Sequence, residues 1–163
     1  MIIKTIFTFF IFILFTVNSY SAGSSDDNSS KVKSNYDKAV TIIKSAKKYE
    51  IKGKIEKANK RYEKALTLLI KSNEKKPNKA DTLNYLGFTT RKLGDYEGGE
   101  KYYLQGLALE PNHIGINEYL GELYVVTNRI DLAKERLNIL ENCDCEEYDE
   151  LKKIIAWTKK SKY

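Results

Sequence analysis

Apolar positions recur at helical spacing over most of the chain after residue 35. In the stretch 80–113, Leu83, Leu86 and Thr90 form one stripe, and Tyr96, Gly99, Tyr103 and Leu107 form the next. Spacings of three and four residues place side chains on one face of a helix. Gly94, between the stripes, can end a helix in the left-handed conformation, and the Asp95 side chain can cap the next one. The pattern predicts two amphipathic helices joined by a tight turn.

The same pattern returns in three successive segments of equal length, 46–79, 80–113 and 114–147. Three columns show the repetition: Gly53, Gly87 and Gly121; Ala65, Gly99 and Ala133; Pro77 and Pro111. Self-similarity at a fixed period of about 34 residues is the signature of a helical repeat protein.

These residues resemble the tetratricopeptide repeat (TPR). The second segment carries its pattern as Leu83, Leu86-Gly87, Thr90, Gly99, Tyr103, Gly106 and Pro111, and the third as Leu120-Gly121, Tyr124, Ala133 and Leu137. The first segment matches well only from Tyr62 to Pro77, because Lys52 stands where the pattern has Leu. The resemblance covers the three segments and implies an all-α fold, a TPR α-solenoid of about three helix-turn-helix repeats.

The repeats lie within a TPR domain that we expect to span 35–161. From Tyr36 onward the apolar residues keep helical spacing, and no Gly or Pro occurs until Gly53, which predicts a long first helix from about Ser34 to Asn59. At the other end, Tyr148, Leu151, Ile154 and Ile155 form an apolar stripe after an acidic start. This stripe predicts a C-terminal capping helix over 145–161, as repeat arrays need a solvated end.

The N-terminal region reads as an export signal. Lys4 precedes an apolar run from Ile6 to Val17, and small residues follow. We expect a signal peptide over 1–21 and a flexible leader over 22–34, with an exported chain in the periplasm or secreted. Cleavage would leave no transmembrane segment. The alternative is an uncleaved signal that tethers the chain to a membrane, although the run is shorter than a usual span.

The formal net charge is +6, and of the 28 basic residues 24 are Lys. Arg is the side chain suited to bidentate recognition of phosphates and bases. Diffuse lysine therefore disfavours nucleic acid as a partner and indicates a solvated basic surface.

In TPR proteins the first helices of successive repeats line a concave groove. The resemblance implies that a partner-binding groove is lined by Asn84, Tyr85, Phe88, Arg91, Glu118, Tyr119 and Glu122. Aromatic side chains flanked by Arg and Glu suit an extended peptide or a partner helix. The alternative is that Tyr85 and Tyr119 pack against neighbouring helices.

Two cysteines, Cys143 and Cys145, flank a single Asp. In an oxidising compartment such a pair favours a local disulfide. Two reduced thiols, a redox switch and a soft-metal (copper) site are the alternatives. We predict no resident metal or cofactor, because His113 is the only histidine and a four-ligand zinc site cannot be filled.

Catalytic residues are not apparent. The sequence lacks a nucleophile-and-base pair at motif spacing and a Gly-rich phosphate loop, and His113 is expected in an exposed turn. We therefore expect a non-enzymatic scaffold or adaptor that binds a protein partner. A thiol-redox or copper-handling accessory protein using Cys143 and Cys145 is the alternative function, and self-association through the ends of the repeat stack is a further possibility.

Overall fold

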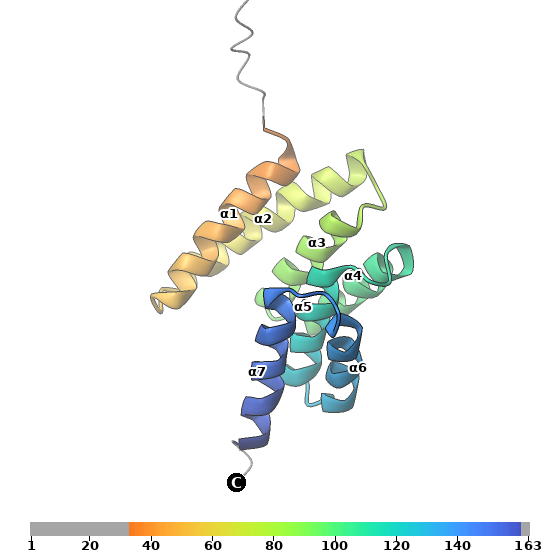
Figure 1. The fold of residues 1–163 in the computed structure, drawn as a ribbon. Helices are drawn as coiled ribbons and strands as arrows, with labels where there is room; N and C mark the ends of the chain where they lie inside the picture. Colours follow the sequence, from red (N-terminus) through yellow and green to blue (C-terminus); the bar gives the residue numbers. More distant parts are fainter. Residues whose placement is uncertain (1–32, 161–163) are drawn as a thin grey trace, which may run out of the picture. The chain divides into compact units, whose positions relative to one another are not determined.

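The structure is a computed structural model in which residues 33–160 are described (Figure 1). This part of the chain contains α-helices and no strand, which confirms the all-α prediction. The helices are α1 (Asn35–Ile51), α2 (Ile55–Lys75), α3 (Ala80–Lys92), α4 (Tyr96–Leu109), α5 (Ile114–Val126), α6 (Ile130–Leu140) and α7 (Glu146–Lys160).

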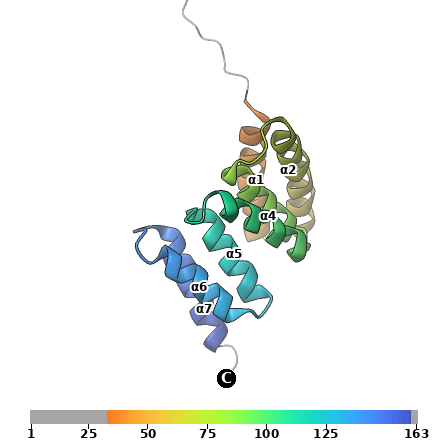
Figure 2. The ribbon, with the colours of Figure 1, turned by 90° about the vertical axis from the view of Figure 1, so that its right-hand side faces the viewer.

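Consecutive helices pack in pairs, α1 with α2, α3 with α4 and α5 with α6, and α7 then packs on α5 and α6 (Figures 1 and 2). The odd-numbered helices also contact one another in order, from α1 through α3 and α5 to α7. Helix α2 also packs on α3, and α4 on α5, so each pair joins the next through both of its helices.

The turns inside the three pairs share one hydrogen-bond pattern. At Gly94, φ is 96°, and the Asp95 amide donates back to the Thr90 carbonyl. The turns at Asn128 (φ 59°) and Gly53 (φ 67°) have the same bond, from the amide one residue later to the carbonyl at the same place in the preceding helix. This six-to-one bond with a left-handed residue is the Schellman helix ending, and Gly and Asn tolerate that conformation best.

The predicted continuous helix from Ser34 to Asn59 is wrong, because the chain reverses at Gly53. The repeat boundary predicted at residue 46 lies inside α1, where Ala46 is fully buried. Gly53 therefore differs from Gly87 and Gly121, which lie within α3 and α5. The turn at Gly53 lies further from the turn at Gly94 than one repeat period, because α2 has 21 residues where α4 has 14.

Two apolar clusters form the core. The first joins α1, α2 and α3 and includes Ile43, Tyr62, Leu69 and Leu86. The second joins α4, α5, α6 and α7 and is made by Tyr103, Leu120, Leu140, Leu151 and their neighbours. Tyr119 packs against both clusters, so the α3–α5 contact links them.

Glycines inside helices allow close packing. A Cβ on Gly87 would lie 2.6 Å from ring carbons of Tyr103, and one on Gly121 would lie 2.5 Å from Leu151 Cδ2. Gly98, whose small size the repeat pattern does not explain, has another reason. The Gly98 amide donates to the capping carboxylate of Asp95 at 2.8 Å, and a Cβ on Gly98 would collide with that carboxylate.

The signal peptide predicted over 1–21 and most of the leader predicted over 22–34 lie outside the described residues. The leader's last residue, Ser34, caps α1 through its side chain. The capping helix predicted over 145–161 corresponds to α7. Within residues 33–160, no helix combines the length and the apolar character needed to span a bilayer.

Candidate functional site

The seven residues predicted to line a groove lie on two neighbouring helices. Helix α3 carries Asn84, Tyr85, Phe88 and Arg91, and α5 carries Glu118, Tyr119 and Glu122. Spacings of three and four residues place the members of each group on one face of their helix. The α3–α5 contact brings the two groups together.

Phe88 is the centre of an aromatic cluster that spans three helices. Its ring centroid lies 4.9 Å from that of Tyr119 on α5 and 5.9 Å from that of Tyr62 on α2. Tyr85, one turn earlier on α3, meets Tyr36 of α1 edge to face at 5.8 Å. Tilted and edge-to-face pairs at these distances are favourable. The cluster therefore fixes α3 between the first helical pair and α5.

Lys47 of α1 covers this cluster. Its Nζ lies 4.7 Å from the Phe88 ring centroid and 5.2 Å from that of Tyr119, and it donates a hydrogen bond of 3.1 Å to the Tyr119 hydroxyl. An ammonium over two ring faces is held by cation–π attraction. Lys47 thus places a positive charge on the α1 side of the candidate site.

The α5 side of the site is acidic. Arg91 donates to Glu122 at 2.6 Å, and this ion pair joins α3 to α5. Glu118 is 3% exposed, and burial together with Glu122 of α5 and Glu150 and Glu147 of α7 raises its pKa to about 9. The pKa of Glu118 therefore keeps this side chain protonated at neutral pH.

The seven residues differ in how much solvent they can reach. Asn84, Phe88, Arg91 and Glu118 are less than a tenth exposed and pack in the interior, whereas Tyr85, Tyr119 and Glu122 are half-buried. A partner can therefore touch only the last three of the predicted set. We call the surface formed by Tyr85, Tyr119, Glu122, Tyr36 and Lys47 the odd-helix face.

Sequence reasoning missed the contribution of α1 and α7 to this site. Tyr36 and Lys47 come from α1, and Glu147 and Glu150 come from α7. A signal for α1 existed, because Tyr36, Ile43 and Lys47 are spaced by seven and four residues and so share a face. Glu147 and Glu150 also share a face, being three residues apart, but this spacing does not reveal that α7 packs beside Glu118.

The comparisons with known proteins are negative. No protein-family model matches the sequence, and no curated protein matches it. The site is therefore interpreted from its own geometry.

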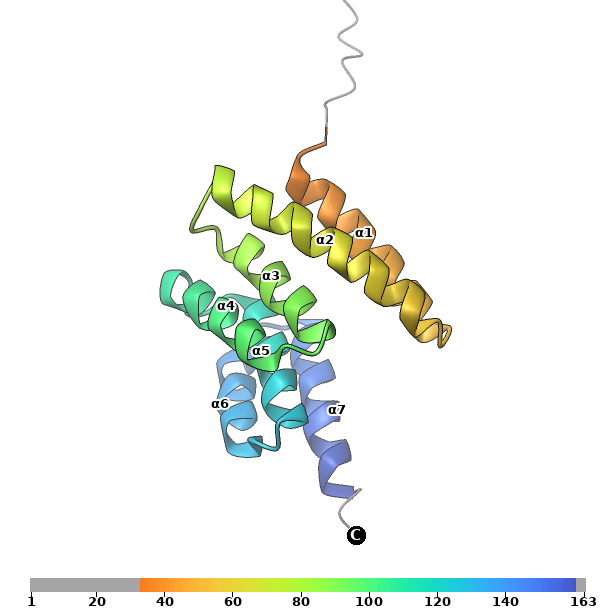
Figure 3. The same cartoon turned by 180° about the vertical axis from the view of Figure 1, so that it is seen from behind.

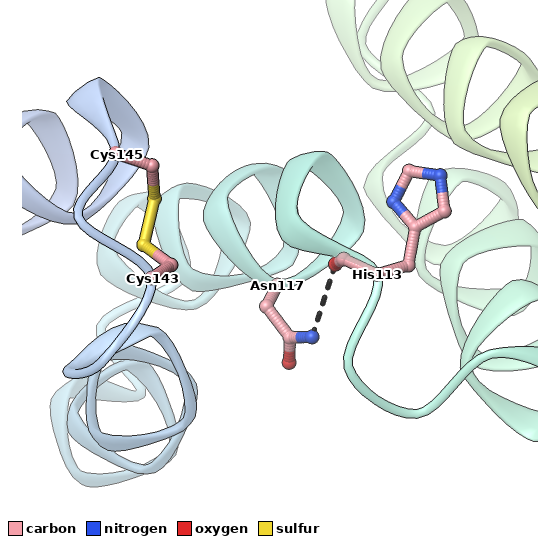
Figure 4. Close-up of a disulfide and its surroundings, with 4 residues drawn as sticks. All are labelled: His113, Asn117, Cys143 and Cys145. Atoms are coloured by element: carbon pink, nitrogen blue, oxygen red, sulfur yellow. Dashed lines mark hydrogen bonds between the residues drawn. A yellow bond between two sulfur atoms is a disulfide. The ribbon is translucent and has the colours of Figure 1, made fainter.

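The two cysteines lie in the loop between α6 and α7 and form a disulfide (Figure 4). The bond spans one residue, Asp144, whose φ is 47°, and the two Cα atoms are 5.2 Å apart. Cys143 packs against the second core cluster. In this oxidised state neither sulfur is a thiolate, the form in which cysteine binds soft metals. Within residues 33–160, no group of three or more His, Cys, Asp or Glu side chains could hold a metal ion.

His113 is half-buried and caps α5, so the expectation of an exposed turn is wrong. Its Nδ1 accepts a hydrogen bond from the Ile116 amide at 3.2 Å, and its Nε2 lies 3.2 Å from the Asp81 carboxylate. Nearby Asn117 is fully buried and donates to the carbonyl of His113 (Figure 4). It also donates to the carbonyl of Pro111. Both residues therefore fasten the α4–α5 loop to the start of α5.

Proposed function

We propose that this chain is a TPR-type α-solenoid of three helical pairs with α7 as its cap, and that it acts as a non-enzymatic scaffold binding a protein partner on the odd-helix face. The repeat interpretation is supported by the Schellman turns at Gly94 and Asn128, which occupy the same position in the second and third segments. It is also supported by the small residues at the helix crossings, Gly87 and Gly121.

The observation that carries the binding proposal is the half-buried pair Tyr85 and Tyr119 on successive first helices. Both rings rest on a packed floor, and the Tyr119 hydroxyl is hydrogen-bonded to Lys47. Tyrosines held rigidly with one side accessible are typical anchors in protein interfaces, because little conformational entropy remains to be lost. A peptide or helix with an aromatic or aliphatic anchor fits this face.

Charge on the two sides of the face favours a partner of mixed polarity. Lys47 of α1 lies on one side and Glu122 of α5 on the other. An acidic side chain of the partner would lie toward Lys47 and a basic one toward α5 and α7. This arrangement would determine the direction in which a segment binds, and it would contribute less to the affinity of binding.

Site-specific photo-crosslinking in the cell that makes the protein tests the proposal. A photoreactive side chain is placed at Tyr85 or Tyr119, and as matched controls at the exposed residues Gln105 of α4 and Lys134 of α6. We expect both tyrosine positions to capture the same protein and the controls to capture none of it. Equal capture from all four positions, or capture from the controls alone, would place the partner elsewhere.

A double substitution then tests affinity. Tyr85→Ser with Tyr119→Ser removes the accessible rings and leaves the buried Phe88 and Arg91 in place, so helicity by circular dichroism should be retained. Affinity for the captured partner should fall at least tenfold, since truncating an anchor residue costs about 2 kcal/mol or more. Unchanged affinity would contradict the proposal.

A further inference from the structure

Charge is segregated between two regions of the described chain. Residues 33–79, which form α1, α2 and their flanks, contain 15 basic and 5 acidic side chains, a net charge of +10. Residues 80–160 contain 10 basic and 15 acidic side chains, a net charge of −5. Lys supplies 14 of the 15 basic residues in the first region. The excess positive charge therefore belongs to one helical pair.

The turn of this pair projects past the rest of the helices (Figure 3). Aligning Tyr62 of α2 with Tyr96 of α4, its counterpart in the next segment, makes the two helices end together and leaves 55–61 as extra length at the turn. Seven residues of helix add about 10 Å. Glu50 still contacts the end of α3, where Lys92 donates to it, and it also accepts a hydrogen bond from Tyr62 of α2. We call residues 48–57 the hairpin tip.

The hairpin tip exposes apolar side chains at its end. Ile51 is 86% exposed and Ile55 is 52% exposed, on either side of Lys52-Gly53-Lys54. Single exposed apolar residues are common on protein surfaces. Two isoleucines at a projecting turn, however, form a small apolar patch that can insert into a deformable surface. Ile55 also lines a hollow with Tyr96 and Val126, so Ile51 is the residue most clearly directed to solvent.

Lysines surround these isoleucines. Lys48, Lys52, Lys54 and Lys57 are all exposed, and within residues 33–160 no ion pair joins any of them to an acid. The acids of the tip are engaged elsewhere: Glu56 pairs with Lys60, and Glu50 points back to Lys92 and Tyr62. Burial would raise the pKa of Glu50, but the hydrogen bonds from Lys92 and Tyr62 outweigh burial and lower it. The outward charge of the tip is therefore positive.

From this arrangement we propose that the hairpin tip is a contact site for an anionic lipid surface, with Ile51 and Ile55 entering the headgroup–acyl boundary and the four lysines lying among lipid phosphates. Apolar insertion and lysine attraction to anionic lipid add together in such contacts. Lys acts as a point charge and needs no fixed acceptor geometry, which suits a fluid array of headgroups. The contact is independent of partner binding on the odd-helix face.

Fluorescence of a single indole at the tip tests this proposal in the full-length chain. The natural chain has one tryptophan, Trp157, which is 75% exposed on α7. The variant Ile51→Trp with Trp157→Phe moves the indole to the tip, and Ile55→Trp serves if the first variant does not fold. The reporter is local, so membrane contact made by another part of the chain does not move its emission.

The probes are vesicles of phosphatidylglycerol and phosphatidylcholine in equal parts, and vesicles of phosphatidylcholine alone. We expect a blue shift and quenching by brominated acyl chains with the anionic vesicles only, and loss of both at high salt. The Trp157 indole of the natural chain should not shift. Replacing Lys48, Lys52, Lys54 and Lys57 by Gln should raise the half-maximal lipid concentration at least a hundredfold, about fivefold for each lysine.

A matched variant separates the tip from net charge. Substituting Lys71, Lys75, Lys76 and Lys79 by Gln removes the same charge at the other end of α2 and should weaken binding much less. Equal loss from both sets, a shift with neutral vesicles, or no shift at all would overturn the proposal. A shift caused by poly-glutamate or DNA in the absence of a vesicle response would overturn it in favour of a soluble polyanion.

Discussion

The first helical pair and the two pairs that follow use the same turn but differ in length and charge. All three pairs reverse through a left-handed residue with the same hydrogen bonds, at Gly53, Gly94 and Asn128. Only the first pair carries a second helix of 21 residues, against 14 in α4, and a large excess of lysine. The turn is thus a shared requirement of the fold. The length and charge of one pair can change without disturbing that turn.

Phe88 is one of the α3 side chains that pack against the first pair, and its ring also contacts α5. Phe88→Ala removes contacts to Tyr62 on one side and Tyr119 on the other, and should lower the free energy of unfolding by about 3–5 kcal/mol. Urea denaturation followed by circular dichroism measures this loss.

Two controls define the effect of Phe88→Ala. Phe88→Leu keeps most of the volume and should cost less than about 1.5 kcal/mol. Leu104→Ala, at an exposed position of α4, should cost little. If Phe88→Ala were as mild as Leu104→Ala, the two regions would not be joined through this ring.

A change of pH should alter the stability of the second region more than that of the first, because Glu118 lies in the second region. The pKa of Glu118 is about 9 in the folded chain and 4.5 as its ordinary value, so between these values the folded state holds a proton that the unfolded state has released. Stability therefore falls as pH rises through this range. The contribution is on the order of 2–3 kcal/mol between pH 5 and pH 7.

The comparison of Glu118→Gln with the natural chain checks this prediction. Gln keeps the shape without the charge, so the variant should lose that pH dependence and exceed the natural chain in stability at pH 8. Glu63→Gln, at an exposed position of α2, should leave the profile unchanged. A natural chain whose stability rises from pH 5 to pH 8 would contradict the assignment.

The glycines that align in the sequence repeat should respond to substitution in two different ways. Gly87→Ala places a methyl group against the buried ring of Tyr103 and should cost about 2 kcal/mol through overpacking. Gly53→Ala meets no atom within 4 Å and should cost only about 1 kcal/mol, because of its positive φ.

Gly53→Asn separates the two causes, since Asn tolerates the left-handed conformation and should recover most of the loss at Gly53. Thermal denaturation of the three variants is sufficient. Equal losses for Gly87→Ala and Gly53→Ala, without recovery by Asn, would mean that Gly53 lies in a helix.

A small effect, comparable with that of Gly53→Ala, is expected for the disulfide. The double variant Cys143→Ser, Cys145→Ser removes a bond that closes a very short loop, so it should lower stability by about 1–2 kcal/mol at most. Partner capture at Tyr85 should be unchanged. Loss of capture without loss of stability would favour a redox role for the pair.

Much of the second region could be predicted from the sequence. The turns at Gly94 and Asn128 and the cap at Asp95 each follow from local chemistry that one residue type satisfies. The helical character of α7 followed from its apolar stripe. These features do not depend on distant parts of the chain, so a pattern of neighbours is sufficient to find them.

The turn of the first pair was harder to predict, because the extra residues of α2 amount to nearly two helical turns. An insertion of that length leaves the apolar stripe in phase, so Tyr62, Ala65 and Leu69 still align with the following repeat while the turn moves from the position expected near residue 60 to Gly53. The burial of part of the candidate site could not be predicted for another reason. Spacing gives the face of a helix, but the depth of Phe88 and Arg91 depends on Lys47 and Tyr119, which other helices bring to them.

The division of the core into two clusters also sets an order of events during synthesis. The first cluster needs only residues up to Phe88, so its helices can close while the later part of the chain is still being made. The second includes Leu151 and Ile155, and the atoms nearest to the open side of Gly121 are those of Leu151. Contacts between near neighbours in sequence favour rapid closure of each pair. The last helix to be synthesised therefore completes the second half of the protein, and a chain stopped before α7 would leave α5 uncovered.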